Sequence, residues 1–330
     1  MNKRLIAGVS ALLLASIASG VFIGTHAIRY DTAANIKMSP NAPWGSVAAL
    51  ASMKNLKNAG AQAGMIVAFT WQPTAESDTP ILGQDSSPEI VRKGIIDVRQ
   101  AGLMPMLKIH LWIPNHWAGQ VNPAHPDIWF DNYWKAISPL IDLARKENIP
   151  AIIIGTEMRG VETDDGWNRL ISAARMKYAG KIIYDTDSLD QAMKFQHWNL
   201  FDAIATSLYT ALSDDPQTRQ KIMVDNADKL SALGKKWNKP VWVAELGIRS
   251  ADGLMAKPWI SPEEQNPPVN LAIQNTVLHE WRNALTSKGV KMFSIWCWYT
   301  NPKDGGAENS DFTIQNKPAQ SVLKHPLLYP

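Results

Sequence analysis

Strand-like apolar runs alternate with amphipathic stretches of helical length along most of this 330-residue chain. Such alternation is typical of parallel strands joined by crossover helices. Eight units of this kind close into a (β/α)8 barrel, the TIM-barrel fold, which takes about 250 residues. We predict strands at 64–70, 103–110, 150–155, 181–184, 203–207, 241–244 and 291–298, with an eighth between 109 and 149. Helices are expected at 46–59, 87–101, 129–147, 167–178, 216–236 and 269–287.

The composition is that of a globular domain, with 45% apolar and 19% charged residues. The net charge of +3 lacks the dense basic face that nucleic-acid binding needs, so we expect no nucleic-acid partner. The lone Cys297 excludes an internal disulfide framework. We therefore expect a monomer that is stabilised by packing alone.

The N-terminus has the pattern of an export signal. Lys3 and Arg4 precede an apolar run from Leu5 to Ile23 that only Gly and Ser interrupt. Small residues around 25–27 suit a signal peptidase, yet the run is also long enough to span a bilayer uncleaved. We expect residues 1–27 to be either a signal peptide or an anchor in the inner membrane. The protein would then be periplasmic or extracellular.

No linker or internal repeat divides the rest of the chain. Residues 28–45 are polar and contain prolines, so we expect an extended lead-in that wraps the barrel. Residues 46–330 are expected to form a single domain. Ser87 followed by Pro88 predicts a helix N-terminus, and Asp215 followed by Pro216 predicts another.

Two glutamates each follow an apolar run that is typical of a buried strand. Glu157 comes after 151–156, and Glu245 comes after 240–244. Burial disfavours an ionised carboxylate, so a glutamate in this position is usually paired, hydrogen-bonded or catalytic. Active sites of (β/α)8 barrels lie at the C-terminal ends of the strands. Two carboxyl groups in one such site indicate the hydrolysis of glycosidic bonds.

Other strand ends carry polar and aromatic side chains that suit a sugar ligand. The chain has 14 Trp, whose flat apolar faces can stack on pyranose rings while the indole N–H reaches a hydroxyl. We therefore expect a polysaccharide or oligosaccharide substrate. The candidate substrate-binding residues are Trp71, Lys108, His110, Thr156, Asp185, Tyr209, Arg249, Trp296 and Trp298.

The order of these motifs resembles glycoside hydrolase family 113, the β-mannanase-like group within the clan of retaining (β/α)8 glycosidases. The resemblance covers roughly 44–323. The motifs that carry it are Thr-Trp-Gln at 70–72, Met-Leu-Lys-Ile-His at 106–110, Ile-Gly-Thr-Glu at 154–157, Tyr-Asp-Thr-Asp at 184–187, Ser-Leu-Tyr at 207–209, Ala-Glu-Leu-Gly-Ile-Arg-Ser at 244–250 and Ile-Trp-Cys-Trp at 295–298.

The resemblance implies a retaining double displacement on a β-linked polysaccharide, either mannan-like or a bacterial exopolysaccharide. Glu245, after the seventh strand, would attack the anomeric carbon, and Glu157, after the fourth strand, would be the acid/base. Tyr209 would donate to Glu245, and Trp296 or Trp298 would form the floor under the reacting sugar. No cofactor or metal is implied. Many clan members have Asn before the acid/base, where this chain has Thr156, which leaves the sugar identity open.

Other interpretations stay open at this stage. Glu157 could form a structural ion pair with Arg159 or Arg249, and at least one of Trp296 and Trp298 could fill the barrel interior. The protein could also be a catalytically silent carbohydrate-binding barrel associated with exopolysaccharide secretion. The spacing of His110, His116 and His125 matches no zinc pattern.

Overall fold

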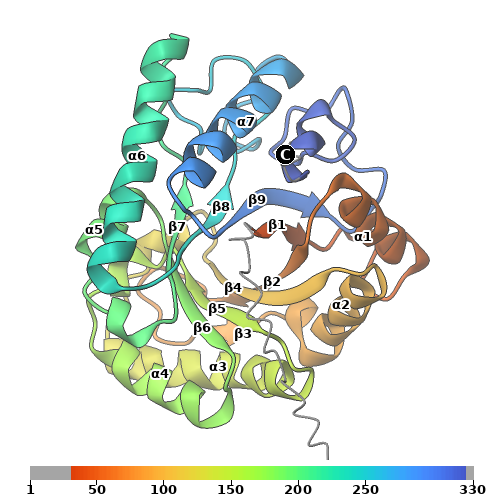
Figure 1. Ribbon diagram of the computed structural model, residues 1–330. Coiled ribbons are helices and arrows are strands. Elements are labelled where there is room, and N and C mark those ends of the chain that lie inside the picture. The colour runs from red at the N-terminus through yellow and green to blue at the C-terminus, as the bar shows by residue number, and fades with distance from the viewer. Residues whose placement is uncertain (1–30, 325–330) are drawn as a thin grey trace, which may run out of the picture.

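The computed structural model describes residues 31–324 and shows a closed barrel of parallel strands inside a layer of helices (Figure 1). Around the barrel the strands follow the order β1, β2, β4, β5, β6, β7, β8 and β9. β9 pairs with β1 and closes the ring. The two-residue β3 pairs antiparallel with the end of β2 and lies outside this ring. The predicted (β/α)8 fold is confirmed.

Within residues 31–324, the elements match the predicted positions closely, apart from the first strand and the short helix α5, which were not predicted. The strands are β1 (Asp31–Lys37), β2 (Ala63–Trp71), β3 (Ile81–Leu82), β4 (Met104–Trp112), β5 (Ala151–Thr156), β6 (Lys181–Thr186), β7 (Ile204–Leu208), β8 (Val241–Leu246) and β9 (Met292–Tyr299). The α-helices are α1 (Val47–Ala59), α2 (Pro88–Gln100), α3 (Pro126–Lys146), α4 (Gly166–Lys177), α5 (Leu189–Lys194), α6 (Pro216–Trp237) and α7 (Leu271–Ser287).

The predicted helix N-termini are confirmed at α2 and α6. The Ser87 hydroxyl accepts a hydrogen bond from the Ile90 amide, and the Asp215 carboxylate accepts one from the Thr218 amide. Each bond satisfies an amide that has no partner inside the helix. Each of these helices therefore begins at a defined residue after the preceding loop. This start fixes where the helix packs against the barrel.

The first barrel strand lies in the segment that we expected to be a lead-in. β1 pairs with both β2 and β9, so the domain includes residues 31–45 rather than starting at 46. The prediction missed it because Ile36 is the only large apolar residue in β1, and the interior face of the strand carries the small Ala33 and the polar Asn35, whose amide donates to the Ser294 hydroxyl at 3.0 Å. The expected eighth strand between 109 and 149 was wrong, since α3 occupies most of that stretch.

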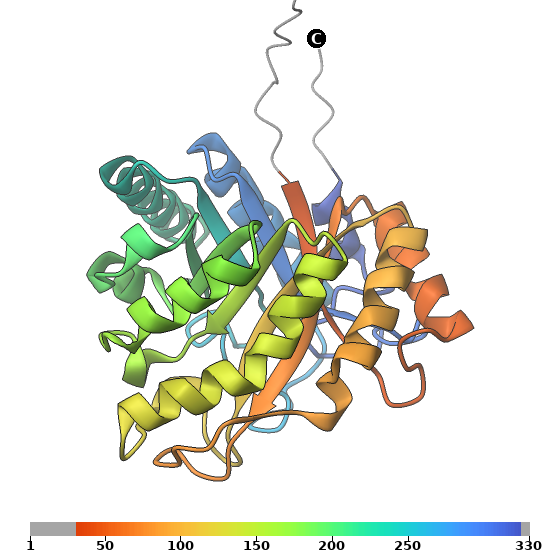
Figure 2. The same ribbon diagram turned by 90° about the horizontal axis from the view of Figure 1, so that it is seen from below.

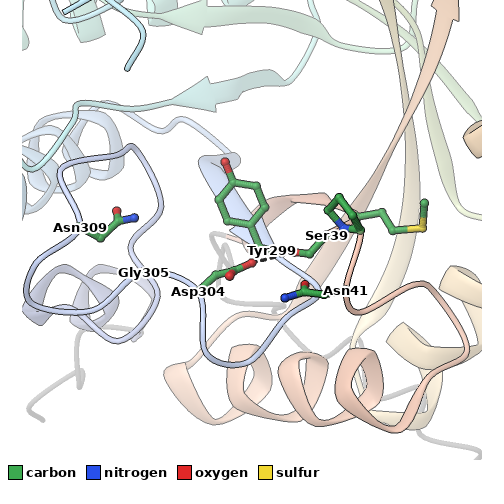
Figure 3. A pocket seen from close by; sticks show the side chains of 8 residues that line it. Ser39, Asn41, Tyr299, Asp304, Gly305 and Asn309 are labelled. Atoms are coloured by element: carbon green, nitrogen blue, oxygen red, sulfur yellow. Dashed lines mark hydrogen bonds between the residues drawn. The ribbon is translucent and has the colours of Figure 1, made fainter. Parts of the chain in front are cut away.

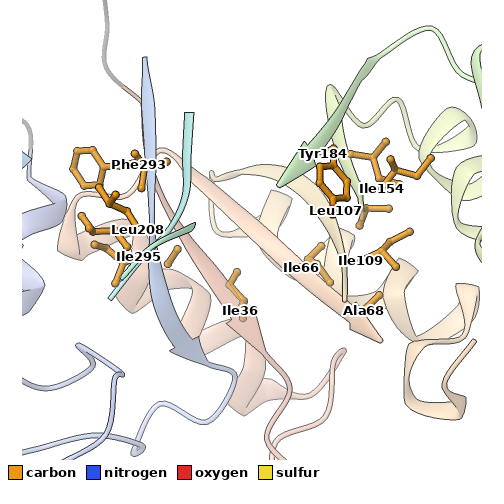
Figure 4. Packing of buried hydrophobic residues seen from close by; sticks show 14 of the residues in the cluster. Ile36, Ile66, Ala68, Leu107, Ile109, Ile154, Tyr184, Leu208, Phe293 and Ile295 are labelled. Carbon is orange, nitrogen blue, oxygen red and sulfur yellow. The ribbon is translucent and has the colours of Figure 1, made fainter. Parts of the chain in front are cut away.

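The main hydrophobic core lies between the barrel and the helices. Figure 4 shows part of it, with Ile66, Ile109 and Ile295 on three different strands. A smaller cluster fills the barrel interior and includes Met65, Met106 and other residues of the same inward-facing rows. Because side chains alternate along a strand, each barrel strand serves both clusters.

Single extra residues interrupt this alternation on three strands. The pairing register skips Ile154 on β5, Ala244 on β8 and Cys297 on β9. An extra residue of this kind reverses which face the following side chains point to, and bulges of this type are common next to active sites. These three bulges decide the direction of several side chains at the C-terminal ends of the strands.

β1 starts, and the described chain ends, at the barrel face opposite the C-terminal ends of the strands (Figure 2). Thr32 Oγ1 donates to the Leu323 carbonyl there, at 3.1 Å. Among residues 31–324, no helix is long and apolar enough to cross a membrane. The predicted signal or anchor at 1–27 lies outside the described residues.

Candidate active site

The two glutamates lie at the same end of the barrel. Glu157 directly follows β5, which is the fourth strand of the ring, and Glu245 lies on β8, which is the seventh. Their positions agree with the strand numbers that the resemblance implies. Each position also carries a backbone irregularity that aims the side chain.

Glu245 points into the barrel because Ala244 is the extra residue of the β8 bulge. Ala244 already faces the interior, and the bulge lets Glu245 face it too, opposite Ser207 of β7. Glu157 has a left-handed backbone, with φ of 56°, and its amide donates to the Asp185 carbonyl at 2.7 Å. Such a conformation is costly for a residue other than Gly and is concentrated at functional sites.

Glu245 is buried and held by charged and polar groups. Lys108 Nζ lies 2.6 Å from Glu245 Oε1 and 2.8 Å from Asp185 Oδ2, and the Tyr209 hydroxyl donates to Glu245 Oε2 at 2.9 Å. His110 Nε2 is 3.1 Å from Oε1 but misses hydrogen-bond geometry. Burial alone would raise the pKa of Glu245, but the Lys108 charge and His110 outweigh it and lower the pKa to about 2. Glu245 is therefore ionised at neutral pH.

Glu157 has the opposite electrostatic environment. Burial raises its pKa, and the negative charges of Glu245 and Asp185 raise it further, to about 8. The Trp117 indole donates a hydrogen bond to Glu157, with Nε1 2.8 Å from Oε2, and a hydrogen bond with Ser207 also favours its ionised form. Glu157 is therefore mostly protonated at neutral pH. One proton donor and one carboxylate in the same site form the pair that acid-assisted displacement requires.

Trp117 is a site residue that sequence reasoning did not select. Its ring packs against Gly119, where any Cβ would come within 2.2 Å of the indole. Arg159 lies over the ring at 5.0 Å from the centroid and is fixed by a two-pronged ion pair with Asp187, at 2.6 and 2.8 Å. In the sequence, Trp117 is only an aromatic residue in the loop after β4. Its hydrogen-bond partner Glu157 follows the next barrel strand, β5, so the local sequence does not reveal the contact.

Three predicted binding residues lie at the mouth of the barrel. Trp71 is exposed at the end of β2, and Trp296 and His110 are partly exposed, with their rings 5.3 Å apart. The predicted contact between Tyr209 and Glu245 is confirmed. These side chains surround the space above Glu245.

Lys108, Thr156 and Asp185 have no exposed surface, which corrects the expectation that they contact sugar hydroxyls. Lys108 and Asp185 lie beneath Glu245 and set its charge. Thr156 donates to the Ile109 carbonyl at 2.9 Å, so its hydroxyl is engaged inside the barrel wall. These residues position the glutamates and their strands instead.

Trp298 and Arg249 are also corrected. The Cys297 bulge turns Trp298 outward beside Ile36, and its indole donates to the Ser52 hydroxyl of α1 at 2.9 Å. Trp298 therefore belongs to the main core between the barrel and the helices and does not fill the barrel interior, in contrast to one interpretation of the sequence. Arg249 is fully buried and donates to the Ser261, Gln265 and Ser310 carbonyls, so it holds two loops together.

The structural ion pair considered for Glu157 is not formed within residues 31–324. Arg159 pairs with Asp187, and Arg249 is occupied by loop carbonyls. In that part of the chain no three His, Cys, Asp or Glu side chains converge in a way that could hold a metal ion.

Comparisons with known proteins agree with this geometry. The family model described as Glycoside Hydrolase Family 113 matches residues 36–317. A family 113 β-1,4-mannanase in a complex is 23% identical, with a TM-score of 0.78 over 90% of this chain and 97% of that one. The family 113 β-mannanase from Alicyclobacillus acidocaldarius, in complex with ManMIm, is 20% identical, with a TM-score of 0.76 over 90% and 95% of the two chains.

The fold is shared more widely than the family. A GH5_18 structure from Streptomyces cattleya in complex with GlcNAc is 10% identical, with a TM-score of 0.57 over 90% of this chain and 79% of that one. No curated protein sequence matches the chain significantly. Since the family model spans most of the barrel, the chain belongs to glycoside hydrolase family 113.

Proposed function

We propose that this glycoside hydrolase cleaves a β-linked, mannan-like polysaccharide with retention of anomeric configuration. The observation that carries the proposal is the opposite ionisation of two carboxyl groups in one barrel mouth, with a pKa of about 2 for Glu245 and about 8 for Glu157. The two family 113 structures described above are named as mannanases, which supports mannan as the substrate class.

In the proposed first step, Glu245 attacks the anomeric carbon and Glu157 gives its proton to the departing glycosidic oxygen. A covalent glycosyl-enzyme forms, and the shortened chain leaves. In the second step, Glu157 takes a proton from water, the water oxygen attacks the anomeric carbon, and the bond to Glu245 breaks. Lys108 and Tyr209 keep Glu245 ionised and oriented for both steps.

A polysaccharide panel tests the proposal. The protein without residues 1–27 is incubated with β-mannan, glucomannan, β-glucan and the producer's own exopolysaccharide, and new reducing ends are measured. We expect cleavage of β-mannan or glucomannan, with the β anomer appearing first by NMR. Initial release of the α anomer would contradict retention. Binding without cleavage, equal in the wild type and in Glu157→Gln and Glu245→Gln, would instead support a silent binding barrel.

We also propose that the protein is exported. The support is the basic start and the apolar run of residues 1–23. N-terminal sequencing of the protein from the periplasmic, membrane and culture fractions tests this, and recovery of the full-length chain from the cytosol would contradict it.

The pH profile follows from the two pKa values. Glu245 must be ionised, so kcat/KM is lost as pH falls through about 2, and Glu157 must be protonated, so kcat/KM is lost as pH rises through about 8. We expect a level profile from about pH 4 to 7 and a tenfold fall per unit above about 8. Initial rates at low substrate concentration measure it. An alkaline fall in kcat/KM that begins below about pH 6 would contradict the role of Glu157.

Trp117→Phe removes the indole N–H that donates to Glu157 and keeps an aromatic ring at that position. The Trp117 N–H favours the ionised form of Glu157, so its loss raises the pKa of Glu157. The alkaline fall in kcat/KM should then move to higher pH, by up to about 1 pH unit for a bond worth about 1 kcal/mol. We also expect kcat to fall, because Glu157 loses its fixed orientation. Trp134→Phe on α3 is the control. If the alkaline fall in kcat/KM of Trp117→Phe stayed at the pH of the wild type, Trp117 would contribute only packing against its neighbours.

A further inference from the structure

The loop after β5 contains a third carboxyl group, that of Glu162, which the proposed reaction does not use. Glu162 is 4% exposed, and its Oε1 accepts a hydrogen bond from the Tyr184 hydroxyl at 3.0 Å. Burial and the negative charge of Asp187 raise the pKa of Glu162 to about 7. Because a carboxyl group is costly to bury, one that ends a chain of hydrogen bonds usually has a structural or catalytic role.

Tyr184 links Glu162 to the backbone of Met158. The Tyr184 hydroxyl donates to Glu162 and accepts from the Met158 amide, at 3.0 Å in each case. The Tyr184 ring is fully buried, stacks on Phe195 with the centroids 5.0 Å apart, and meets Trp167 edge-on at 4.9 Å. Since aromatic rings pack against it, the ring holds its hydroxyl in one place. The Met158 amide therefore has a fixed acceptor.

Two successive amides anchor the backbone on both sides of the Glu157 side chain. The Glu157 amide donates to the Asp185 carbonyl at 2.7 Å, and the next amide, that of Met158, donates to the Tyr184 hydroxyl. Both acceptors belong to β6. Because the two amides flank the Cα atom of Glu157, together they hold both backbone dihedrals of this residue, including its left-handed φ of 56°.

The turn after Glu157 brings Glu162 back to this anchor. The Arg159 amide donates to the Glu157 carbonyl at 2.9 Å, and Met158 between them has φ of −85° and ψ of 59°, which is an inverse γ-turn. A short 3-10 helix at 159–161 follows and ends at Glu162. The loop that carries Glu157 thus closes on itself through one side chain of β6.

We propose that Tyr184 and Glu162 are positioning residues for the acid/base Glu157. The Tyr184 hydroxyl, itself held by Glu162, fixes the Met158 amide and so keeps the Glu157 carboxyl group aimed at the departing oxygen. Both residues are buried, so they act through the backbone and not by touching the substrate. A misplacement of a reacting group by about 1 Å is enough to cost about 10²-fold in rate. The inference rests on the proposed function and deepens it.

A positioning role for the acid predicts an effect that depends on the leaving group. Cleavage of β-mannan expels a sugar hydroxyl that needs the proton of Glu157, whereas an aryl β-mannoside with an acidic phenol leaves without it. The first step determines kcat/KM on both substrates. The ratio of the two kcat/KM values therefore reports how well Glu157 is placed, and a general loss of stability does not change it.

Tyr184→Phe removes the hydroxyl and keeps the ring. We expect kcat/KM on β-mannan to fall roughly 10- to 100-fold, while kcat/KM on the aryl β-mannoside changes by less than about threefold. Glu162→Met should act in the same direction, because it leaves the hydroxyl without its acceptor. Glu162→Gln keeps an acceptor oxygen and should retain more activity on mannan than Glu162→Met. Urea unfolding checks that the variants fold, and Glu162→Met carries the test if Tyr184→Phe does not.

Two other tyrosines offer matched controls. The Tyr178 hydroxyl donates to the Ile149 carbonyl at 2.7 Å, so Tyr178→Phe removes a buried hydroxyl near the opposite end of β5. The Tyr299 hydroxyl donates to the Asp311 carboxylate at 3.0 Å on β9, across the ring from β5, and Tyr299 lines a cavity of about 520 Å³ (Figure 3). Both hydroxyls are bound away from the 157–162 loop, so neither substitution should change the ratio of the two kcat/KM values.

Equal losses on mannan and on the aryl mannoside would overturn the positioning role, and so would a selective loss on mannan in Tyr178→Phe. Hydrogen exchange of the Met158 amide, followed by NMR with isotope-labelled methionine, gives a readout without turnover. Faster exchange in Tyr184→Phe and Glu162→Met supports the anchor, and unchanged exchange overturns it. If the wild type cleaved neither substrate while the exchange became faster in both variants, the proposed function would fail and the anchor would stand.

Discussion

Glu245→Gln is expected to reduce kcat on mannan by roughly 10⁴- to 10⁶-fold, the scale of losing a catalytic nucleophile. The amide cannot form the glycosyl-enzyme, and the change removes one negative charge from beside Lys108. Reducing-end release measures the loss. Glu280→Gln on α7 is a matched control, since Glu280 only pairs with Arg219 there. Residual activity within about tenfold of the wild type would contradict the assignment.

Glu157→Ala tests the proposed division of roles, with Glu157 as the acid/base and Glu245 as the nucleophile. On mannan we expect a loss of about 10²- to 10⁴-fold, because the leaving oxygen needs a proton. On an aryl glycoside with an acidic phenol the first step needs no proton, so the glycosyl-enzyme should accumulate. Added azide should then release the β-glycosyl azide. An α-glycosyl azide from this variant would reverse the two roles.

Lys108→Met is expected to destabilise the fold by about 3–5 kcal/mol, the usual cost of leaving buried charges without their partner. Lys108 is fully buried and lies within 2.8 Å of carboxylates on two strands, Asp185 on β6 and Glu245 on β8. Urea unfolding measures the loss. Lys177→Met, which breaks a partly exposed pair with Asp142, is the control and should cost about 0–1 kcal/mol. Equal losses in the two variants would contradict the role of Lys108.

The sign of the pH effect gives Lys108→Met a second readout. Without the ammonium, burial raises the pKa of Glu245 and Asp185 above the values of the unfolded chain. The folded variant then binds more protons than the unfolded one, so its stability falls as pH rises. The loss should be larger at pH 8 than at pH 5. The acid limb of kcat/KM should also move upward, because Glu245 now protonates at higher pH. A pH-independent loss would indicate packing alone.

Much of the fold was predictable because its signals are local. All the described α-helices except the short α5, together with seven barrel strands, follow from apolar periodicity, and the starts of α2 and α6 follow from Ser87 and Asp215. β1 was missed because the crowded barrel interior accepts the small Ala33, which leaves no apolar pattern. The two glutamates were predictable as well, since a carboxylate directly after an apolar run is rare without a role.

The alternation of side chains along a strand misled the sequence interpretation at Trp298. A strict two-residue alternation places Trp298 on the same face of β9 as Trp296, but the extra residue Cys297 turns Trp298 toward α1. The extra Ala244 similarly allows two successive residues of β8 to face the interior. A bulge depends on how a strand pairs with its neighbours, so one strand's sequence does not reveal it.

The amino-acid sequence by itself determined the barrel fold, most of its elements and the strand ends that carry Glu157 and Glu245, because hydrophobic periodicity and capping act over a few residues. Only the tertiary structure decided the charge of each glutamate, which side chains reach the mouth, and that Trp117 meets Glu157. The reason is physical: a pKa and a direct contact depend on groups brought close by other strands, and burial, bulges and loop packing arise only once the barrel has closed.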